Sequence, residues 1–274
     1  MPGADGVAPD RTGRVALVTG AARGQGRSHC LAMAAAGADV AALDICADLD
    51  VPSYHLGTRA ELDETVAGVE QLDRRAVPLV ADVRAADQVA AAVAATVDAL
   101  GRIDIVVNNA AVVTSAPFWE LTEAQWQAVI DIDLGGVWRV AKAAAPHVRM
   151  FDRGRIVNIA STAGQRAVGD FAHSVAAKHG VIGLTRAMAI ELAPDGVTVN
   201  ALLPGTVQSP MLDGLADELG LTAADVHRRF LHHQLFETVI QPSEVTGALL
   251  WLLGDTACGV TGHCLAVDGG SLAH

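Results

Sequence analysis

The chain has 274 residues, of which 51% are hydrophobic and 18% are charged, and its formal net charge at pH 7 is −12. This length and composition predict one packed α/β domain with a sizeable core, and the absence of any basic run argues against a nucleic-acid partner. No apolar stretch reaches the length of a membrane span and no signal-peptide pattern opens the chain, so we expect a cytoplasmic protein without membrane contact.

The four cysteines are scattered and form no CxxC pair, which predicts free thiols rather than disulfides or a zinc site. No HExxH or Cys/His ligand spacing occurs either, so we expect no metal centre. Residues 1–12 are rich in Pro and Gly and are predicted to form a flexible tail. Residues 13–274 are predicted to form a single domain, because no linker interrupts them.

Strand-like and helix-like segments alternate along the chain. A β-branched run at 14–20 predicts a buried parallel strand, and an Ala-rich segment at 26–37 predicts the helix after it. Apolar residues at helical spacing predict another helix at 58–75. Further strands are predicted at 38–44, 76–82, 103–110, 154–161, 196–204 and 263–270. This order predicts a Rossmann-type, doubly wound sheet of about seven mostly parallel strands with helices on both faces.

A glycine-rich turn follows the first predicted strand. The segment "TGAARGQG" places Gly20, Gly24 and Gly26 between that strand and the first helix. Glycines there let a backbone approach a pyrophosphate, which the N-terminus of the helix then binds through its N–H groups. The spacing is GxxxGxG rather than GxGxxG, and a tight turn that needs positive φ is the alternative.

The second predicted strand ends at Asp44, 24 residues beyond Gly20. A carboxylate at that point can accept hydrogen bonds from the adenosine ribose and repels a 2′-phosphate, which favours NAD over NADP. Arg23 is a weaker signal in the opposite direction, because a basic residue in the first turn can hold a 2′-phosphate.

Further motifs carry a resemblance over nearly the whole chain. They are "ADV" at 81–83, "NNAA" at 108–111, "IVNIASTAG" at 156–164, "AAKHGVIGLTRAMAIELA" at 176–193, "VTVNALLPGTV" at 197–207 and "TGHCLAVDGG" at 261–270. Together with the glycine turn, they resemble the short-chain dehydrogenase/reductase family. The long segment 44–75 is similar to that of the actinobacterial, mycofactocin-coupled subgroup typified by carveol dehydrogenase, in which this insertion helps to cover a tightly held NAD.

The resemblance implies an NAD site. Asp82 and Val83 would contact the adenine, and Ala111 stands where the family has the last glycine of NNAG. The full set implied for the cofactor is Gly20, Arg23, Gln25, Gly26, Asp44, Ile45, Asp82, Val83, Asn109, Ala110, Ala111, Lys178, Pro204, Gly205 and Val207. Tyr54, the only tyrosine, lies in the insertion and is expected to pack over the cofactor.

The resemblance also implies a catalytic group with two departures from the family pattern. Ser161 matches the serine that hydrogen-bonds the substrate oxygen, and Lys178 matches the lysine that binds the nicotinamide ribose. Asp133 occupies the position of the family's asparagine, and Ser174 occupies that of its catalytic tyrosine. Only two of the 19 Lys and Arg residues are lysines, and this bias toward arginine independently argues against Lys178 as an incidental solvated charge.

Ser174 cannot inherit the tyrosine's role directly, because an alcohol is far less acidic than a phenol, whose pKa is about 10. General acid–base catalysis typically contributes ~10²–10⁴ in rate. Three readings follow. The first is an NAD-dependent alcohol dehydrogenase or ketone reductase whose tyrosine was replaced deliberately, as is done to trap a bound substrate. The second is a natural relative that performs weak redox or redox-neutral chemistry such as cyclisation or dehydration, and the third is a non-catalytic binding protein. Asp133 favours natural divergence, and the complete cofactor motif favours the first two readings.

The substrate and the assembly are predicted only in class. A lid containing Phe118, Trp119, Met211, Leu212 and Phe236 suggests a hydrophobic secondary alcohol or ketone. His173 adjoins Ser174 but points about 100° round the helix, so it should miss the same pocket. Helical segments at about 122–150 and 171–193 carry many small residues, and the family resemblance implies that they form a homotetramer.

Overall fold

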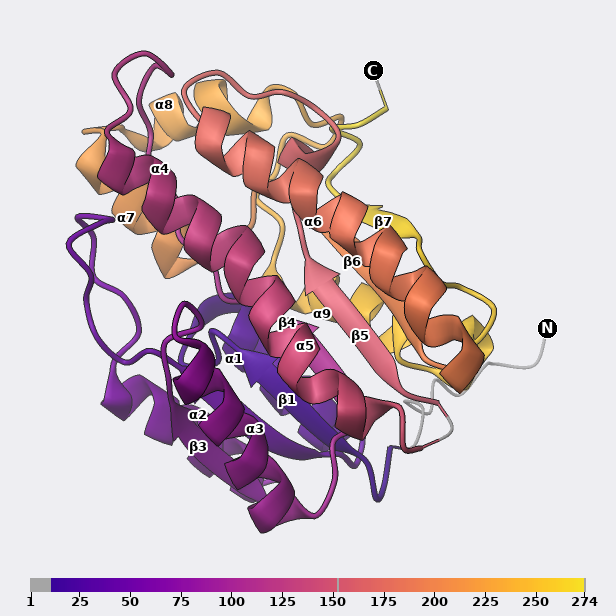
Figure 1. The fold of residues 1–274 in the computed structure, drawn as a ribbon. Coiled ribbons are helices and arrows are strands. Elements are labelled where there is room, and N and C mark those ends of the chain that lie inside the picture. Colours follow the sequence, from indigo (N-terminus) through magenta and orange to yellow (C-terminus); the bar gives the residue numbers. More distant parts are fainter. Residues whose placement is uncertain (1–10, 152, 274) are drawn as a thin grey trace.

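The structure, a computed structural model, describes residues 11–151 and 153–273. Within these ranges, seven strands form one sheet in the order β3-β2-β1-β4-β5-β6-β7, and every neighbouring pair is parallel (Figure 1). The strands are β1 Val15–Thr19, β2 Asp39–Asp44, β3 Ala76–Val80, β4 Ile105–Asn108, β5 Arg155–Ile159, β6 Thr198–Pro204 and β7 Cys264–Val267. The predicted doubly wound fold is confirmed, with each strand inside its predicted segment.

Helices cover both faces of the sheet. On one face lie α3 (Ala86–Leu100), α4 (Glu123–Ile130), the π-helical turn η1 (Asp131–Gly136), α5 (Val137–Val148) and α6 (Ala172–Leu192); on the other lie α1 (Gly24–Ala35), α2 (Arg59–Glu70) and α9 (Pro242–Leu252). In Figure 1 the run from α4 to α5 lies beside α6 in front of the sheet. The shorter elements are η2 Thr162–Gly164, η3 Ala193–Asp195, α7 Pro210–Glu218, α8 Ala223–Val226, the π-helical turn η4 His227–Leu231 and η5 Asp255–Ala257.

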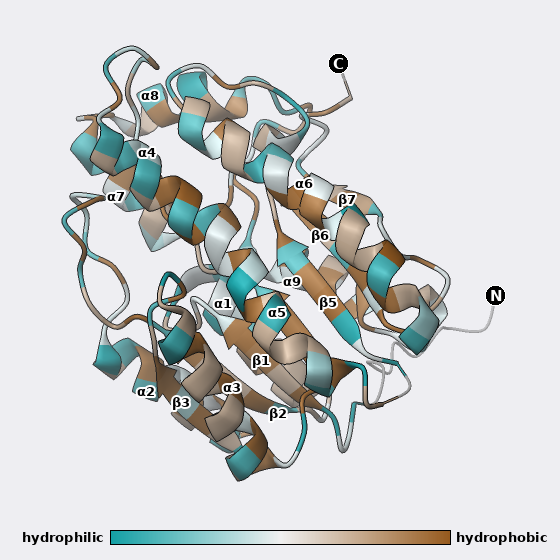
Figure 2. Cartoon of the chain, in the orientation of Figure 1, coloured by the Kyte–Doolittle hydropathy of each residue, from teal (hydrophilic) through white to brown (hydrophobic). Residues whose placement is uncertain are grey.

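The central strands are hydrophobic because helices cover them on both sides. All residues of β1, β2, β4, β5 and β6 are buried, and the strands are largely brown in the hydropathy view of Figure 2. A run of buried Val, Ile and Leu is the pattern expected of a parallel sheet. The chain order reverses between β1 and β4, and ligands of such sheets bind at the carboxyl ends beside this reversal.

The predicted tail at 1–12 lies mostly outside the described residues. Of its last two residues, Arg11 is described and is buried, and its guanidinium donates to the carbonyl oxygen of Leu250 at 2.5 Å. Its backbone N–H also donates to Ala36 O. Arg11 is thus held to α9 by its side chain and to the residue after α1 by its backbone, while the prediction for residues 1–10 lies outside the described residues.

A histidine with no charge partner lies in the contact between α1 and α9. His29 is completely buried, and its Nδ1 lies 2.8 Å from Thr246 Oγ1, which itself donates to Pro242 O. Nδ1 therefore donates, and Nε2 is an unprotonated nitrogen without a partner among the described residues. Burial lowers the pKa of His29 to about 3.

This burial predicts a stability that depends on pH. The unfolded chain protonates His29 near pH 6.5, whereas the folded chain does so only near pH 3, so the free energy of unfolding falls as pH drops through this window. Between pH 7 and 5 the loss from this group is about 2 kcal/mol. In urea unfolding at pH 7 and pH 5, the fall in the free energy of unfolding should be smaller in His29→Gln by this contribution of about 2 kcal/mol. The control variant His179→Gln, which replaces an exposed histidine, should keep the full fall. An unchanged pH dependence in His29→Gln would contradict the assignment of this contribution to His29.

Candidate active site

One cavity of about 380 Å³ lies at the carboxyl ends of the strands. The residues that the sequence assigned to the cofactor or to catalysis line it, apart from Gly26: Gly20, Arg23, Gln25, Asp44, Ile45, Asp82, Val83, Asn109, Ala110, Ala111, Asp133, Ser161, Ser174, Lys178, Pro204, Gly205 and Val207. Gly26 serves packing instead, because a Cβ atom there would lie 1.9 Å from Gly20 O. The structure thus brings the predicted residues together, while their individual roles stay predictions.

The first turn has the form that a dinucleotide needs. Gly20 has φ +66°, and a Cβ atom on it would lie 2.9 Å from Asn109 Nδ2, which donates to Thr19 O and Gly20 O. No side chain caps the start of α1, so its first N–H groups face the cavity without a side-chain acceptor. The buried Gln25 Oε1 has no partner among the described residues. The turn and helix start therefore fit a pyrophosphate.

Asp44 is held at the end of β2 by backbone donors. Ala22 N–H donates to Oδ2 at 3.0 Å and Cys46 N–H donates to Oδ1 at 3.2 Å. The carboxylate lines the cavity, and no cationic side chain of the described residues forms an ion pair with it, so its predicted contact with a ribose remains open to it. Arg23, which is a weaker signal for a 2′-phosphate in the sequence, donates a hydrogen bond from its guanidinium to His55 O.

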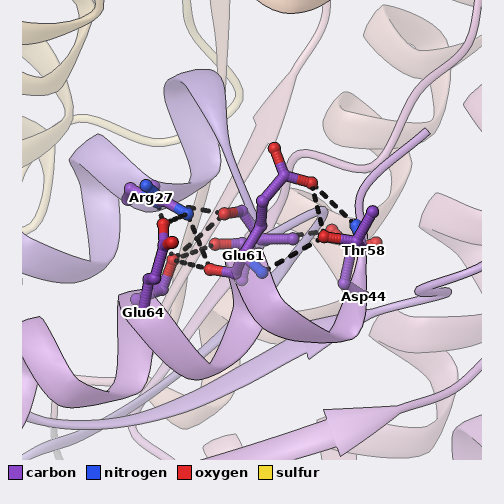
Figure 3. A network of polar contacts seen from close by, with 8 residues as sticks. Arg27, Asp44, Thr58, Glu61 and Glu64 are labelled. Carbon is purple, nitrogen blue, oxygen red and sulfur yellow. Dashed lines mark hydrogen bonds and ion pairs between the residues drawn. The ribbon is translucent and has the colours of Figure 1, made fainter. Parts of the chain in front are cut away.

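The insertion after β2 forms a strap, residues 45–58, that leads from Asp44 to α2. Figure 3 shows how its far end is fixed: Thr58 and Glu61 form a reciprocal capping box, and Arg27 of α1 bonds Glu61 O at 2.7 Å and pairs with Glu64 at 3.0 Å. At the near end, Asp48 accepts from Leu56 N–H at 2.7 Å. The far end of the strap is thus fixed to α2, which Arg27 ties to α1, and the bond between Asp48 and Leu56 closes the strap on itself.

Tyr54 closes the strap over the cavity. Its hydroxyl accepts from Val113 N–H at 3.0 Å, and a Cβ atom on Gly214 of α7 would lie 2.7 Å from Tyr54 Cβ. Burial raises the pKa of the Tyr54 phenol, so it stays neutral at physiological pH. The only tyrosine of the chain is therefore bonded to the segment after β4, and Lys178 has other partners.

Ser161, Ser174 and Lys178 meet where β5 and α6 converge. Ser161 Oγ accepts from Ala163 N–H at 3.1 Å and keeps its own proton for a ligand. Ser174 and Lys178 lie one turn apart on α6, both buried and both lining the cavity. Lys178 Nζ donates to Ile159 O, at the end of β5, at 3.3 Å. The lysine is thus fixed beside the strand that carries Ser161.

Asp133 and Lys178 form a buried ion pair. Lys178 Nζ lies 3.1 Å from Asp133 Oδ2, and Val112 N–H donates to Oδ1 at 2.9 Å. Burial raises the pKa of the Asp133 carboxyl, while Lys178 and the Val112 amide oppose that rise. Asp133 lies in the π-helical turn η1, a local distortion that is frequent at functional sites. Its charge offsets that of Lys178.

Some residues of the predicted apolar lid do not line the cavity. Met211 and Leu212 line the cavity, but Phe118, Trp119 and Phe236 do not and are each at least 70% exposed. Phe118 and Trp119 instead stack edge to face on the surface. The prediction was wrong for these three because hydrophobicity alone does not say which way a loop turns. His173 misses the cavity as predicted, and bonds Thr114 at 2.7 Å.

Several cavity residues were not singled out from the sequence. Arg166 and Val168 follow Ser161 closely, and their place after a strand end was a usable signal. The others, Phe171, Arg229, Phe230, Gln234 and Ser271, come from loops and helical turns whose approach the sequence pattern does not reveal. Across residues 11–151 and 153–273, no cluster of three His, Cys, Asp or Glu side chains is placed to hold a metal ion, and no helix is long and apolar enough to cross a membrane.

Comparison with known proteins places this site in a class. A family model described as enoyl-(acyl carrier protein) reductase matches residues 20–271. The (-)-trans-carveol dehydrogenase of Rhodococcus erythropolis is 40% identical over 271 residues, which cover 94% of this chain and 97% of that relative. The chain belongs to the short-chain dehydrogenase/reductase family.

Solved structures narrow the class further. Carveol dehydrogenase from Mycobacterium avium in complex with NAD matches with a TM-score of 0.92 at 39% identity, covering 97% of this chain and all of that one. A short chain dehydrogenase from Mycobacterium paratuberculosis bound to NAD gives 0.89 at 38% identity, covering 96% and 99%. The resemblance to the carveol-dehydrogenase-like actinobacterial subgroup is thereby confirmed.

Asp44 generates a prediction about cofactor choice. Because its carboxylate would repel a 2′-phosphate, NADH should bind at least ~10-fold more tightly than NADPH, and Asp44→Ala should narrow that gap. Calorimetric titration measures both. Asp63→Ala removes an exposed carboxylate of α2 that does not line the cavity and should leave the gap unchanged. Equal affinities of the unaltered protein for the two cofactors would refute this role of Asp44.

Proposed function

We propose that the chain is an NAD-dependent oxidoreductase that interconverts a hydrophobic secondary alcohol and its ketone, with catalysis altered by Ser174. The observation that carries this proposal is the placement of Lys178: a buried lysine beside the end of β5, one helical turn from residue 174, in a cavity whose other end fits a dinucleotide. The NAD complexes of two similar structures support the choice of cofactor.

The residues of this chain divide the work in the following way. NAD, when bound, accepts or supplies the hydride. Ser161 donates a hydrogen bond to the substrate oxygen, and the proton that this oxygen loses or gains passes to or from a water in the space beside Ser174. Lys178 directs its remaining Nζ proton to the cofactor ribose. Asp44 selects the cofactor, and Tyr54 with the strap excludes water above it. Ser174 contributes a small hydroxyl and leaves space where the family's phenol would stand.

A second candidate is a redox-neutral step on a bound substrate, such as a cyclisation or dehydration. The Asp133–Lys178 ion pair favours this candidate, because the carboxylate offsets the positive charge by which a lysine would lower the pKa of a tyrosine. The pair also places a carboxylate with a raised pKa at the cavity wall, where it can exchange a proton. A purely binding role is the third alternative.

Restoring the tyrosine separates these candidates. Ser174→Tyr should raise NAD-dependent oxidation of secondary alcohols, carveol among them, by at least ~10²-fold, the lower bound for a general acid–base residue. The pH–rate profile of this variant should gain a limb from the titration of the new phenol. Adding Lys178→Ala to Ser174→Tyr should remove most of the increase in rate. The absorbance of NADH gives the rates.

Asp133→Asn provides the matched partner variant. Combined with Ser174→Tyr, it should raise the rate further, because Lys178 then acts on the tyrosine without a neutralising carboxylate. In the unaltered background, a large loss of activity on Asp133→Asn would show that the carboxylate does acid–base work. If Ser174→Tyr abolishes a native activity instead of raising oxidation, the redox-neutral candidate replaces the first. Thermal stability of each variant with NADH bound distinguishes lost chemistry from lost fold.

We also propose that the chain assembles as a homotetramer through the outer helices α4–α5 and α6, which lie side by side (Figure 1) and carry the exposed apolar side chains of Trp126, Trp138 and Ile190. Apolar surface on adjacent helices is typical of an interface. Light scattering at micromolar concentration should give four times the chain mass of 28.2 kDa. A monomer under those conditions would argue against the assembly.

A further inference from the structure

The cavity has a substrate end as well as a cofactor end. Beyond Ser161 and Ser174 its wall is formed by the apolar side chains of Val168, Phe171 and Phe230, together with Arg166. Arg166 belongs to the loop that follows β5 and η2, five residues after Ser161. A guanidinium beside apolar walls acts in a medium of low dielectric, where an ionic contact is stronger than in water.

The guanidinium of Arg166 is held in place but is not neutralised. Its Nη1 donates to Ser271 O at 3.1 Å and to Ser271 Oγ at 3.3 Å. Neither Nε nor Nη2 has a hydrogen-bond acceptor, and no carboxylate forms an ion pair with this arginine, in the part of the chain that the structure describes. Two of its donor positions therefore remain for a ligand.

The neighbouring carboxylates are engaged elsewhere. Asp268, which shapes the turn that carries Ser271, accepts from Gly270 N–H at 3.0 Å and from Leu272 N–H at 2.8 Å. Asp170 pairs with Arg229, the second arginine of the cavity wall, at 2.8 Å. Arg229 is thus offset by an acid while Arg166 is not.

The acids that line the cavity lie at its other end or beside the catalytic group. Asp44 accepts from backbone amides, Asp82 is bound by Arg84 at 2.6 Å, and Asp133 pairs with Lys178. None of them forms an ion pair with Arg166. In a chain of net charge −12, the substrate end of the cavity therefore presents one uncompensated positive charge.

We propose that Arg166 binds a carboxylate of the substrate, so that the substrate is a hydroxy or keto acid with an apolar body. This inference rests on the proposed function, which assigns this end of the cavity to the substrate. The planar fork of an arginine matches a carboxylate in two parallel hydrogen bonds. A dianionic phosphate is a poorer match, because Asp170 offsets Arg229, and Arg23, the third arginine that lines the cavity, donates to His55 O in the strap.

Matched ligands test the proposal without turnover. Calorimetry on the NADH-loaded protein compares 3-phenylpropanoate with 3-phenylpropanamide, which share a shape and differ in charge. The acid should bind roughly 10- to 100-fold more tightly, as expected for hydrogen bonds to a charged group. Arg166→Gln should abolish the preference, and Arg166→Lys should keep part of it by retaining the charge without the fork.

Arg228→Gln is the control, because Arg228 adjoins Arg229 but pairs with Asp225 outside the cavity. It should leave the preference intact. Equal binding of acid and amide, a preference that survives in Arg166→Gln, or tighter binding of 2-phenylethyl phosphate than of the acid would overturn the proposal. Binding of NADH to each variant verifies the fold, and failure of NADH to bind the unaltered protein would count against the proposed function instead.

Discussion

The buried ion pair between Lys178 and Asp133 is the interaction on which the geometry of the cavity depends. Two charges removed from water are tolerated only when each has the other and further hydrogen bonds, and removal of one partner from such a pair costs about 3–5 kcal/mol. Here Ile159 O and Val112 N–H provide those further bonds. Because the four groups come from α6, η1, the end of β5 and the segment after β4, the pair holds the elements around residue 174 in one arrangement.

The cofactor end of the cavity is fixed by a different balance of charge. Backbone amides of Ala22 and Cys46 hold the Asp44 carboxylate at the end of β2. Arg23 donates to the strap and Arg27 ties α2 to α1, so the basic groups of this region serve the covering segment. The position of this acid and the engagement of the two arginines are the features on which the predicted preference for NAD rests.

Much of this arrangement could be predicted from the sequence. Runs of buried Val, Ile and Leu mark the strands because parallel strands are covered on both faces, and strand ends locate Asp44 and Ser161 because carboxyl ends converge. Gly26 does not line the cavity, and the sequence could not show this, because a glycine that permits close backbone packing has the same signature as one that faces a ligand. Phe118 and Phe230 show the other limit: which side chains of loops and helical turns enter the cavity depends on tertiary contacts that no local pattern encodes.

The serine at position 174 and the aspartate at position 133 are best understood as one electrostatic change. In a site with a tyrosine, the lysine's positive charge is balanced when the phenol ionises, so a neutral asparagine nearby suffices. With serine no such anion forms, and the buried Lys178 would lack a counter-ion. Asp133 supplies it at 3.1 Å. We propose that the two departures from the family pattern arose together, because a single replacement at position 174 made to inactivate an enzyme would leave the family's asparagine at position 133 in place.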